Sequence, residues 1–254
     1  MYNPYSLENK KILVTGASSG IGRATVIECA RLGASVVMTA RNKERLSEVF
    51  ESLDRTYGQK HQMVIADIAT EEGLSSLVSS VADIDGVSSN VGILVKNNPI
   101  KFLKDENLET VYNVNALSHV KLARDLFKKK KLNKGASYVF TISVGGVTAF
   151  NVGNAAYGMA KAALNSFMKF CAVDFSSRGI RCNSVCPGMI ETPMTDTNDI
   201  FTEEDYKKDM EHYLLRRYGK PEEVAFATAF LLSDASSFIT GVPLLVDGGA
   251  SIVR

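Results

Sequence analysis

Short apolar runs alternate with longer amphipathic stretches along most of this chain. Residues 11–15 form the first run, a helical pattern follows from about 21 to 32, and a second apolar run covers 35–39. An apolar run, an amphipathic helix and a second apolar run together form the strand-helix-strand unit from which parallel α/β sheets are built. Further runs that read as strands lie at 62–66, 86–89, 137–142, 181–186 and 243–246. The sequence therefore predicts an α/β fold, a doubly wound parallel sheet of about seven strands with helices on both faces and right-handed crossovers.

Length and composition favour a single domain over residues 1–254. Of the 254 residues, 45% are hydrophobic, and no Pro-rich or Ser-rich linker divides the chain. A formal net charge of +1 gives no reason to expect nucleic acid or an anionic membrane as a partner, so a small molecule is the expected ligand. The sequence has neither a signal-peptide pattern nor an apolar run of roughly 20 residues, which predicts a cytoplasmic protein.

The cysteines and histidines are scattered along the chain. Cys29, Cys171, Cys182 and Cys186 lie in apolar segments without the Cys-x-x-Cys spacing of many metal sites, and the three histidines are isolated from one another. We expect buried free thiols in preference to disulfides, and no metal site. This pattern disfavours a zinc-dependent oxidation of alcohols.

Two segments interrupt the alternation of strands and helices. Residues 105–131 are long enough for an extended helix, and residues 190–218 form a polar insertion rich in Thr, Asp and Glu. Ligands bind outside the carboxyl ends of the strands in open α/β sheets, so an insertion after the sixth apolar run is a candidate substrate lid. An ordinary surface excursion is the alternative.

A glycine-rich turn joins the first run to the first helix. It reads Thr15-Gly16-Ala17-Ser18-Ser19-Gly20-Ile21-Gly22. Glycines here permit a tight turn and the close approach of a diphosphate to backbone amides, while the helix N-terminus adds a favourable dipole. The spacing Gly-x-x-x-Gly-x-Gly differs from the commoner Gly-x-Gly-x-x-Gly of dinucleotide-binding turns. Alone, the turn is modest support for a nucleotide site.

Tyr157 and Lys161 lie four residues apart in a strongly helical segment. This spacing places the phenol and the ammonium on one face of a helix. A nearby positive charge favours the ionised phenol, so we expect the pKa of Tyr157, ordinarily about 10, to be lowered toward the range of a general acid or base. For such a pair taken alone, a solvated helix face is the alternative.

Taken together, these motifs resemble the short-chain dehydrogenase/reductase family from the first strand almost to the end of the chain. The glycine turn, Tyr157-x-x-x-Lys161 and the closing Val246-Asp247-Gly248-Gly249 occur in the family's order. So do further residues that follow strands or lie in the long helix: Asp67, Asn115, Ser143 and Pro187-Gly188. The resemblance implies one Rossmann-type catalytic domain that transfers hydride between a nicotinamide dinucleotide and CH–OH or C=O groups. The overall pattern is most similar to 3-oxoacyl-acyl-carrier-protein reductases of fatty acid biosynthesis.

The resemblance also implies which residues hold the dinucleotide. Asp67 and Ile68 are similar to the family's adenine-binding pair, and Thr192 is expected to contact the carboxamide or a phosphate. The fourth strand ends Ser89-Asn90-Val91-Gly92, where the family usually has Asn-Asn-Ala-Gly, so Ser89 shortens a structural side chain. The implied cofactor-binding residues are Gly16, Ser18, Ser19, Gly20, Ile21, Gly22, Arg41, Asp67, Ile68, Asn90, Gly92, Tyr157, Lys161, Pro187, Gly188, Ile190 and Thr192.

The end of the second strand is expected to choose between NAD(H) and NADP(H). It reads Thr39-Ala40-Arg41 and offers no carboxylate for the adenosine ribose 2′-hydroxyl. Arg41 can donate charge-assisted hydrogen bonds to a 2′-phosphate, with Ser18 or Asn42 as helpers. We therefore expect NADP(H); the alternative is that Arg41 only caps a surface turn and that NAD(H) is used.

The catalytic residues implied by the resemblance are Asn115, Ser143, Tyr157 and Lys161. A carbonyl that accepts hydride develops negative charge on oxygen, so it needs a proton donor and a second group that holds the oxygen. Tyr157 is the expected donor and Ser143 the holding group. Lys161 is expected to lower the phenol's pKa and bind the nicotinamide ribose, and Asn115 to hold a relay water.

The sequence constrains the substrate least. Three hypotheses stand: an NADPH-dependent reductase of 3-oxoacyl thioesters, a dehydrogenase of a sterol, polyol or other secondary alcohol, and a non-catalytic NADP(H)-binding regulator. The lysines at 128–131, with Lys134 and Arg178, could dock an acidic acyl carrier protein, although lysines at a helix C-terminus also complement its dipole. The resemblance further implies a homotetramer formed through residues 105–131, 154–177 and the last strand.

Overall fold

Seven parallel strands form the centre of the structure, a computed structural model that describes residues 3–95, 98–195 and 202–252. Their order in the sheet is β3-β2-β1-β4-β5-β6-β7. The strands are β1 (Lys11–Thr15), β2 (Ser35–Ala40), β3 (Gln62–Ile65), β4 (Ile84–Ser89), β5 (Leu132–Thr141), β6 (Arg181–Pro187) and β7 (Pro243–Val246). Each overlaps one of the seven apolar runs, so the predicted fold class is confirmed.

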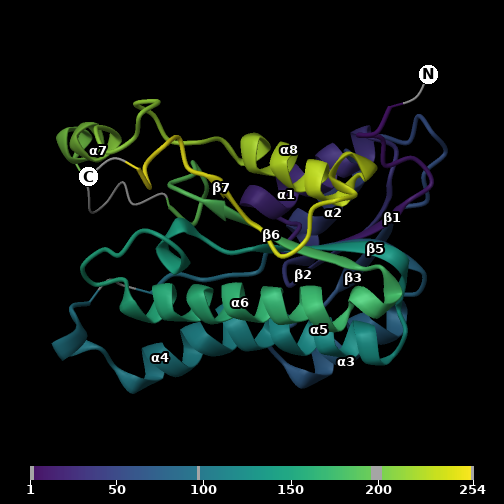
Figure 1. The fold of residues 1–254 in the computed structure, drawn as a ribbon, viewed down its shortest axis with the longest axis horizontal. Helices are drawn as coiled ribbons and strands as arrows, with labels where there is room; N and C mark the ends of the chain where they lie inside the picture. The colour runs from purple at the N-terminus through teal and green to yellow at the C-terminus, as the bar shows by residue number, and fades with distance from the viewer. Residues whose placement is uncertain (1–2, 96–97, 196–201, 253–254) are drawn as a thin grey trace.

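Helices cover both faces of this sheet (Figure 1). One face carries α1 (Gly20–Arg31), α2 (Lys43–Glu51) and α8 (Pro221–Leu232), and the other carries α3 (Glu71–Ser80), α5 (Ser118–Lys128) and α6 (Ala155–Asp174). Successive strand residues point to opposite faces, so Ile12 belongs to the first of these two cores and Leu13 to the second. Burial on both faces explains why the strands read as continuous apolar runs.

The order of the strands reverses beside β1. β1 pairs with β2 on one side and with β4 on the other, while the chain visits β3 in between. The connections that leave β1 and β4 therefore diverge to opposite faces. In open sheets of this kind, the ligand crevice is expected outside the carboxyl ends of these two strands.

The predicted extended helix over 105–131 is helical as far as Lys128 and contains a π-helical turn. It consists of α4 (Asp105–Tyr112), a π-helical turn (Asn113–Leu117) and α5. Such turns occur frequently at functional sites, and this one carries Asn115.

The predicted polar insertion over 190–218 has its two ends fastened together. Ile190 and Gly219 form an isolated parallel bridge, and the Gly219 N–H donates to the Met189 carbonyl at 3.0 Å. The insertion contains α7 (Glu203–Met210). Residues 196–201, which form part of the predicted lid, lie outside the described residues.

Two further expectations concern cysteines and membranes. All four cysteines are buried as free thiols, which confirms the expectation drawn from their spacing. Within the described ranges, no helix is both long and apolar enough to span a bilayer.

Core packing predicts the effect of one substitution. Phe140 is fully buried, with its ring stacked on Tyr138 at 4.4 Å between centroids. Phe140→Ala is expected to lower the free energy of unfolding by about 3–5 kcal/mol, because it removes buried apolar area and leaves a cavity. Urea denaturation followed by circular dichroism measures this change. The control Tyr57→Ala, at an exposed loop side chain, should stay within about 0.5 kcal/mol of the unsubstituted protein; equal losses in both variants would contradict the described packing.

Candidate active site

A glycine turn leads from the carboxyl end of β1 into α1. Gly16 and Gly20 have φ angles of 65° and 51°, which glycine adopts without strain. A methyl group on Gly22 would lie only 2.2 Å from the Gly16 carbonyl oxygen, so the turn folds tightly against the start of α1. A side chain in this position would fill the space between turn and helix.

The amides at the start of α1 are arranged to receive an anion. Ser19 is the N-cap residue, and within the described part of the chain its side chain makes no capping hydrogen bond. The first amides of the helix can therefore donate to a ligand. Thr192 reaches over the turn, since a methyl group on Gly20 would lie 3.4 Å from its Cγ2. A cavity of about 370 Å³ opens beside Ser18, Ser19 and Gly20. These features fit a dinucleotide diphosphate.

Arg41 and Asp67 meet at the carboxyl ends of the neighbouring strands β2 and β3. An Arg41 Nη1 lies 3.6 Å from Asp67 Oδ2, and the arginine side chain is 71% exposed. The other carboxylate oxygen of Asp67 accepts from the Ala69 N–H at 2.9 Å. Asn42, a predicted helper of Arg41, accepts from the Arg45 N–H at 2.8 Å and thereby caps α2. Its amide oxygen is thus already engaged.

Asn90 ties together the ends of three strands. Its backbone N–H donates to Thr15 Oγ1 at 3.0 Å, and its side-chain amide donates to the Thr15 carbonyl at 3.2 Å. The amide oxygen accepts from Thr141 Oγ1 at 2.5 Å. The ends of β1, β4 and β5 are therefore fixed relative to one another at the crevice.

A close backbone contact brings the turn after β5 onto α6. A methyl group on Gly146 would lie 2.6 Å from the Lys161 carbonyl carbon, and one on Gly158 would lie 2.9 Å from the Gly145 carbonyl oxygen. Only glycine allows so close an approach of turn and helix. The result is that Ser143, which begins the turn, lies beside the catalytic candidates of α6.

The Ser143 hydroxyl lies close enough to the Tyr157 phenol to act on its pKa, which hydrogen bonding from the serine lowers. Ser143 Oγ also accepts from the Gly145 N–H at 3.1 Å, which fixes the rotamer of the serine. The serine hydroxyl can therefore donate toward the phenol or toward a ligand oxygen placed between them.

Lys161 is almost completely buried. Its Nζ donates to the Thr141 carbonyl oxygen at 2.9 Å and lies 5.7 Å from the centroid of the Tyr157 ring. Burial disfavours the charged form and lowers the pKa of Lys161 to about 8. The charge of this lysine is therefore lost as the pH rises through about 8.

The expected lowering of the Tyr157 pKa is wrong for the free chain. Burial raises the pKa of Tyr157 to about 12, and the hydrogen bond with Ser143 only partly opposes this. Helical spacing places Lys161 on the same face as the phenol, but the ammonium donates to the Thr141 carbonyl and faces the ring. The cost of burying the phenolate exceeds the stabilisation that its neighbours provide.

Asn115 supports the backbone that follows β4. Its Oδ1 accepts from the Ile93 N–H and its Nδ2 donates to the Ile93 carbonyl, both at 2.8 Å. Both polar atoms of the buried side chain are thus engaged, which indicates a positioning role. The relay water expected at Asn115 stays a prediction.

The remaining predicted residues lie along the same carboxyl edge. Gly188 sits between Asp247 and Tyr213, because a methyl group on it would approach each of them to about 3.2 Å. Ile68 and Ile190 are buried and support the loops after β3 and β6. The structure therefore gathers the predicted cofactor and catalytic residues at one edge of the sheet.

Three polar residues of this edge were missed by the sequence analysis. Thr141 accepts from Lys161 through its carbonyl, and Tyr213 accepts from the Met189 N–H at 3.2 Å through its hydroxyl. His119 lies buried beneath the end of β4. For His119 a signal exists, since it follows Asn115 by four residues and so shares its helix face.

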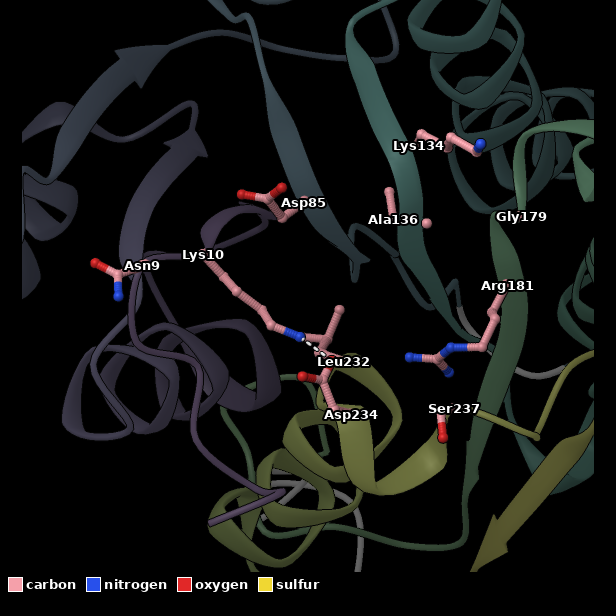
Figure 2. Close-up of a pocket in the computed structure, with 11 residues that line it drawn as sticks. Asn9, Lys10, Asp85, Lys134, Ala136, Gly179, Arg181, Leu232, Asp234 and Ser237 are labelled. Atoms are coloured by element: carbon pink, nitrogen blue, oxygen red, sulfur yellow. Dashed lines mark hydrogen bonds and ion pairs between the residues drawn. The ribbon is translucent and has the colours of Figure 1, made fainter. Parts of the chain in front are cut away.

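The amino edge of the sheet holds a second cavity of about 360 Å³ (Figure 2). Two of its charged pairs or contacts lie within the protein: Lys10 Nζ lies 2.5 Å from Asp234 Oδ1, and Asp85 accepts from the Lys11 N–H at 2.8 Å. Residues 128–131 lie between the end of α5 and the start of β5, at this same edge. The lysine run that could dock a carrier protein therefore does not border Tyr157 within one chain.

Comparisons with known proteins show similarity over nearly the whole length. A family profile described as enoyl-(acyl carrier protein) reductase matches residues 16–251. A 3-oxoacyl-acyl-carrier-protein reductase of Rickettsia felis is 34% identical over 247 residues, 97% of this chain and 99% of that protein. A glucose 1-dehydrogenase of Gluconobacter oxydans is 32% identical over 247 residues, 96% of this chain and 92% of that protein. Among solved structures, a mutant short-chain dehydrogenase/reductase from Serratia marcescens has a TM-score of 0.88 at 30% identity, covering 98% of this chain and 100% of its own.

The burial of Lys161 predicts an unusual titration. In protein carrying carbon-13 at the lysine Cε, the Lys161 signal is expected to titrate with a midpoint of about 8, because burial disfavours the ammonium. Solvated lysines titrate near their ordinary value of about 10.4. NMR titration of the free protein measures the midpoint, and the spectrum of Lys161→Met assigns the signal. A midpoint above about 10 for Lys161 would contradict the described burial.

Proposed function

The chain belongs to the short-chain dehydrogenase/reductase family, and from this premise we propose that it is an NADPH-dependent reductase of 3-oxoacyl thioesters. One observation carries the proposed reaction: the turn after β5 rests on α6 and brings the Ser143 hydroxyl to the Tyr157 phenol, beside the buried Lys161. The thioester substrate is supported by the similarity to the 3-oxoacyl-acyl-carrier-protein reductase of Rickettsia felis.

The side chains supply the acid and the oxygen-binding groups of a carbonyl reduction. When bound, a reduced nicotinamide dinucleotide supplies hydride to the carbonyl carbon. The Tyr157 O–H transfers its proton to the carbonyl oxygen, and the Ser143 O–H donates a hydrogen bond to the same oxygen. The product is a secondary alcohol, and the phenolate left on Tyr157 is stabilised by the Lys161 ammonium near its ring. In this proposal Asn115 keeps the backbone at Ile93 in place.

Arg41 supports the preference for NADP(H). Its ion pair with Asp67 is long and exposed, and such pairs contribute little free energy, so the guanidinium can turn toward a 2′-phosphate at small cost. In this proposal Asp67 and Ile68 contact the adenine, while the glycine turn and Thr192 contact the diphosphate. The proposed cofactor site thus runs from the ends of β2 and β3 to α6.

Exposed apolar side chains along the carboxyl-edge loops support an acyl chain as part of the substrate. Phe150 and Val152 follow β5, and they are 82% and 85% exposed. Met194 follows β6, and Leu214 lies against Gly249 in the second half of the insertion. We propose that the described parts of 190–218 form a wall of the substrate site in one catalytic domain.

The proposed assembly is a homotetramer. Phe170 and Val173 are exposed on α6, and Phe238 is exposed shortly before β7. Exposed apolar groups of this kind favour burial against other copies of the chain.

A dehydrogenase of a sugar, polyol or other secondary alcohol is the second candidate. The observation that favours it is the similarity to glucose 1-dehydrogenase, which is nearly as high as that to the reductase. The third hypothesis, a non-catalytic regulator, is set aside because the family comparison places the chain among enzymes.

The catalytic assignment is tested by removing one hydroxyl group. The unsubstituted enzyme is expected to oxidise NADPH with acetoacetyl thioesters, and Tyr157→Phe is expected to lower kcat by about 100-fold or more, since the proton donor is lost. Absorbance of NADPH measures turnover. Tyr112→Phe, which alters a partly exposed phenol on α4, is the control and should keep full activity. Full turnover in Tyr157→Phe would sink the assignment, and activity with NADP⁺ and free secondary alcohols alone would favour the second candidate.

The cofactor preference is tested at Arg41. Arg41→Ala is expected to raise the KM for NADPH by about 10- to 100-fold, because a charge-assisted contact to the 2′-phosphate is lost. The KM for NADH, which lacks this phosphate, should change by less than about threefold. Lys43→Ala removes an exposed cation two residues away and serves as the control. Equal changes for both cofactors would show that Arg41 does not recognise the phosphate.

A further inference from the structure

A buried histidine fastens the end of β4 to the helix that carries Asn115. His119 is fully buried; its Nδ1 lies 2.6 Å from Ser89 Oγ and its Nε2 lies 2.7 Å from the Val91 carbonyl oxygen. Both ring nitrogens are therefore engaged with the segment that leaves β4. Ser89 is shorter than the asparagine usual in the family, and the His119 imidazole contacts its hydroxyl group.

The direction of these hydrogen bonds follows from their partners. The Val91 carbonyl can only accept, so Nε2 carries the proton and donates. Burial, together with the nearby charge of Lys161, lowers the pKa of His119 to about 3, so the ring is neutral. Nδ1 is then an acceptor, and the Ser89 hydroxyl donates to it. One neutral tautomer satisfies both contacts.

The fastened segment lies between the glycine turn and the catalytic side chains. A methyl group on Gly16 would be 3.5 Å from the Val91 amide nitrogen, so the turn packs directly on this backbone. On the other side, a methyl group on Gly92 would be 3.4 Å from Asn115 Oδ1 and 3.8 Å from Lys161 Nζ. A shift of the Val91 carbonyl would therefore move the backbone that adjoins both the proposed diphosphate turn and Lys161.

His119 and Asn115 act on this backbone as a pair. They lie four residues apart on a continuous helical segment and thus on one face. Asn115 holds Ile93, and His119 holds Val91. Only Gly92 lies between the two supported residues.

We propose that His119 is a positioning residue for the nicotinamide dinucleotide, acting through Ser89 and the Val91 carbonyl on the backbone of residues 90–93. The inference rests on the proposed function, because it assumes that this backbone adjoins a bound dinucleotide. It assigns a role in cofactor affinity to a side chain that takes no part in the proton transfer.

The test measures cofactor binding separately from turnover. His119→Phe keeps a ring of similar size and removes both hydrogen bonds. The dissociation constant for NADPH, measured in the full-length protein from the fluorescence of the nicotinamide, is expected to rise about tenfold. At saturating NADPH and acetoacetyl thioester, kcat should fall less than about threefold, with the thioester KM unchanged. His119→Gln retains a donor and an acceptor and should restore affinity to within about threefold.

His61 provides a matched control. Its Nδ1 accepts from the Val36 N–H at 3.2 Å and its Nε2 lies 2.8 Å from the Asp54 carbonyl oxygen, just before β3 at the amino edge of the sheet. His61→Phe therefore removes the same two kinds of contact far from the site. It is expected to lower the melting temperature and to leave NADPH affinity unchanged.

A second variant keeps the test decisive if His119→Phe does not fold. Ser89→Ala removes only the hydroxyl donor and should also weaken NADPH binding. Where both variants fold, Ser89→Ala combined with His119→Phe should bind NADPH no more weakly than His119→Phe alone, because the two side chains act through one contact.

The outcomes separate this inference from the proposed function. If the unsubstituted chain binds NADPH and the His119 and Ser89 variants bind it equally well, the inference is overturned while the proposed function stands. A loss of affinity in His61→Phe as large as that in His119→Phe would also overturn it. An unsubstituted chain that binds no dinucleotide would overturn both.

Discussion

The site depends on the burial of one lysine. Transfer of an ammonium group out of water costs several kcal/mol unless oxygen atoms replace the lost hydration, and Lys161 finds such an atom in the Thr141 carbonyl. Lys161 can reach this carbonyl because Gly146 lets the turn after β5 pack closely on α6. The same packing of the turn on the helix brings Ser143 close to Tyr157. Burial shifts the pKa of the phenol and that of the ammonium toward their neutral forms, so in the proposed reaction Tyr157 stays protonated until a substrate oxygen accepts the proton.

The sequence was sufficient to predict the layers and the order of secondary structure. Strands buried on both faces leave a strong apolar signal, and all seven were found. β5 begins five residues before its predicted start because Asn133, Lys134 and Gly135 break the apolar pattern, and the pairing with β4 shifts register near its first residues. The π-helical turn around Asn115 leaves no comparable pattern, since it differs from an α-helix only in which carbonyl each amide meets.

For the candidate site, the sequence predicted which residues lie near one another better than it predicted their environments. Spacing placed Tyr157 and Lys161 on one helix face, but the direction of a pKa shift depends on burial and on where each polar atom is directed. The sequence alone does not place the lysines at 128–131 relative to the site, because only the topology shows that α5 ends at the amino edge. His119 looked isolated because its partner Ser89 lies 30 residues earlier in the chain.

The candidate site combines segments that follow several different parallel strands with side chains from two helical segments, Asn115 in the π-helical turn and Tyr157 and Lys161 on α6. Asn90 and Thr15, whose contact joins β4 to β1, are 75 residues apart in the chain. Contacts between residues so distant carry the entropy cost of closing the intervening loops, so they depend on the pairing of the central strands. Helix formation is local, whereas the edge that carries the candidate site requires these long-range pairings. Helix content is therefore no measure of whether this edge has formed.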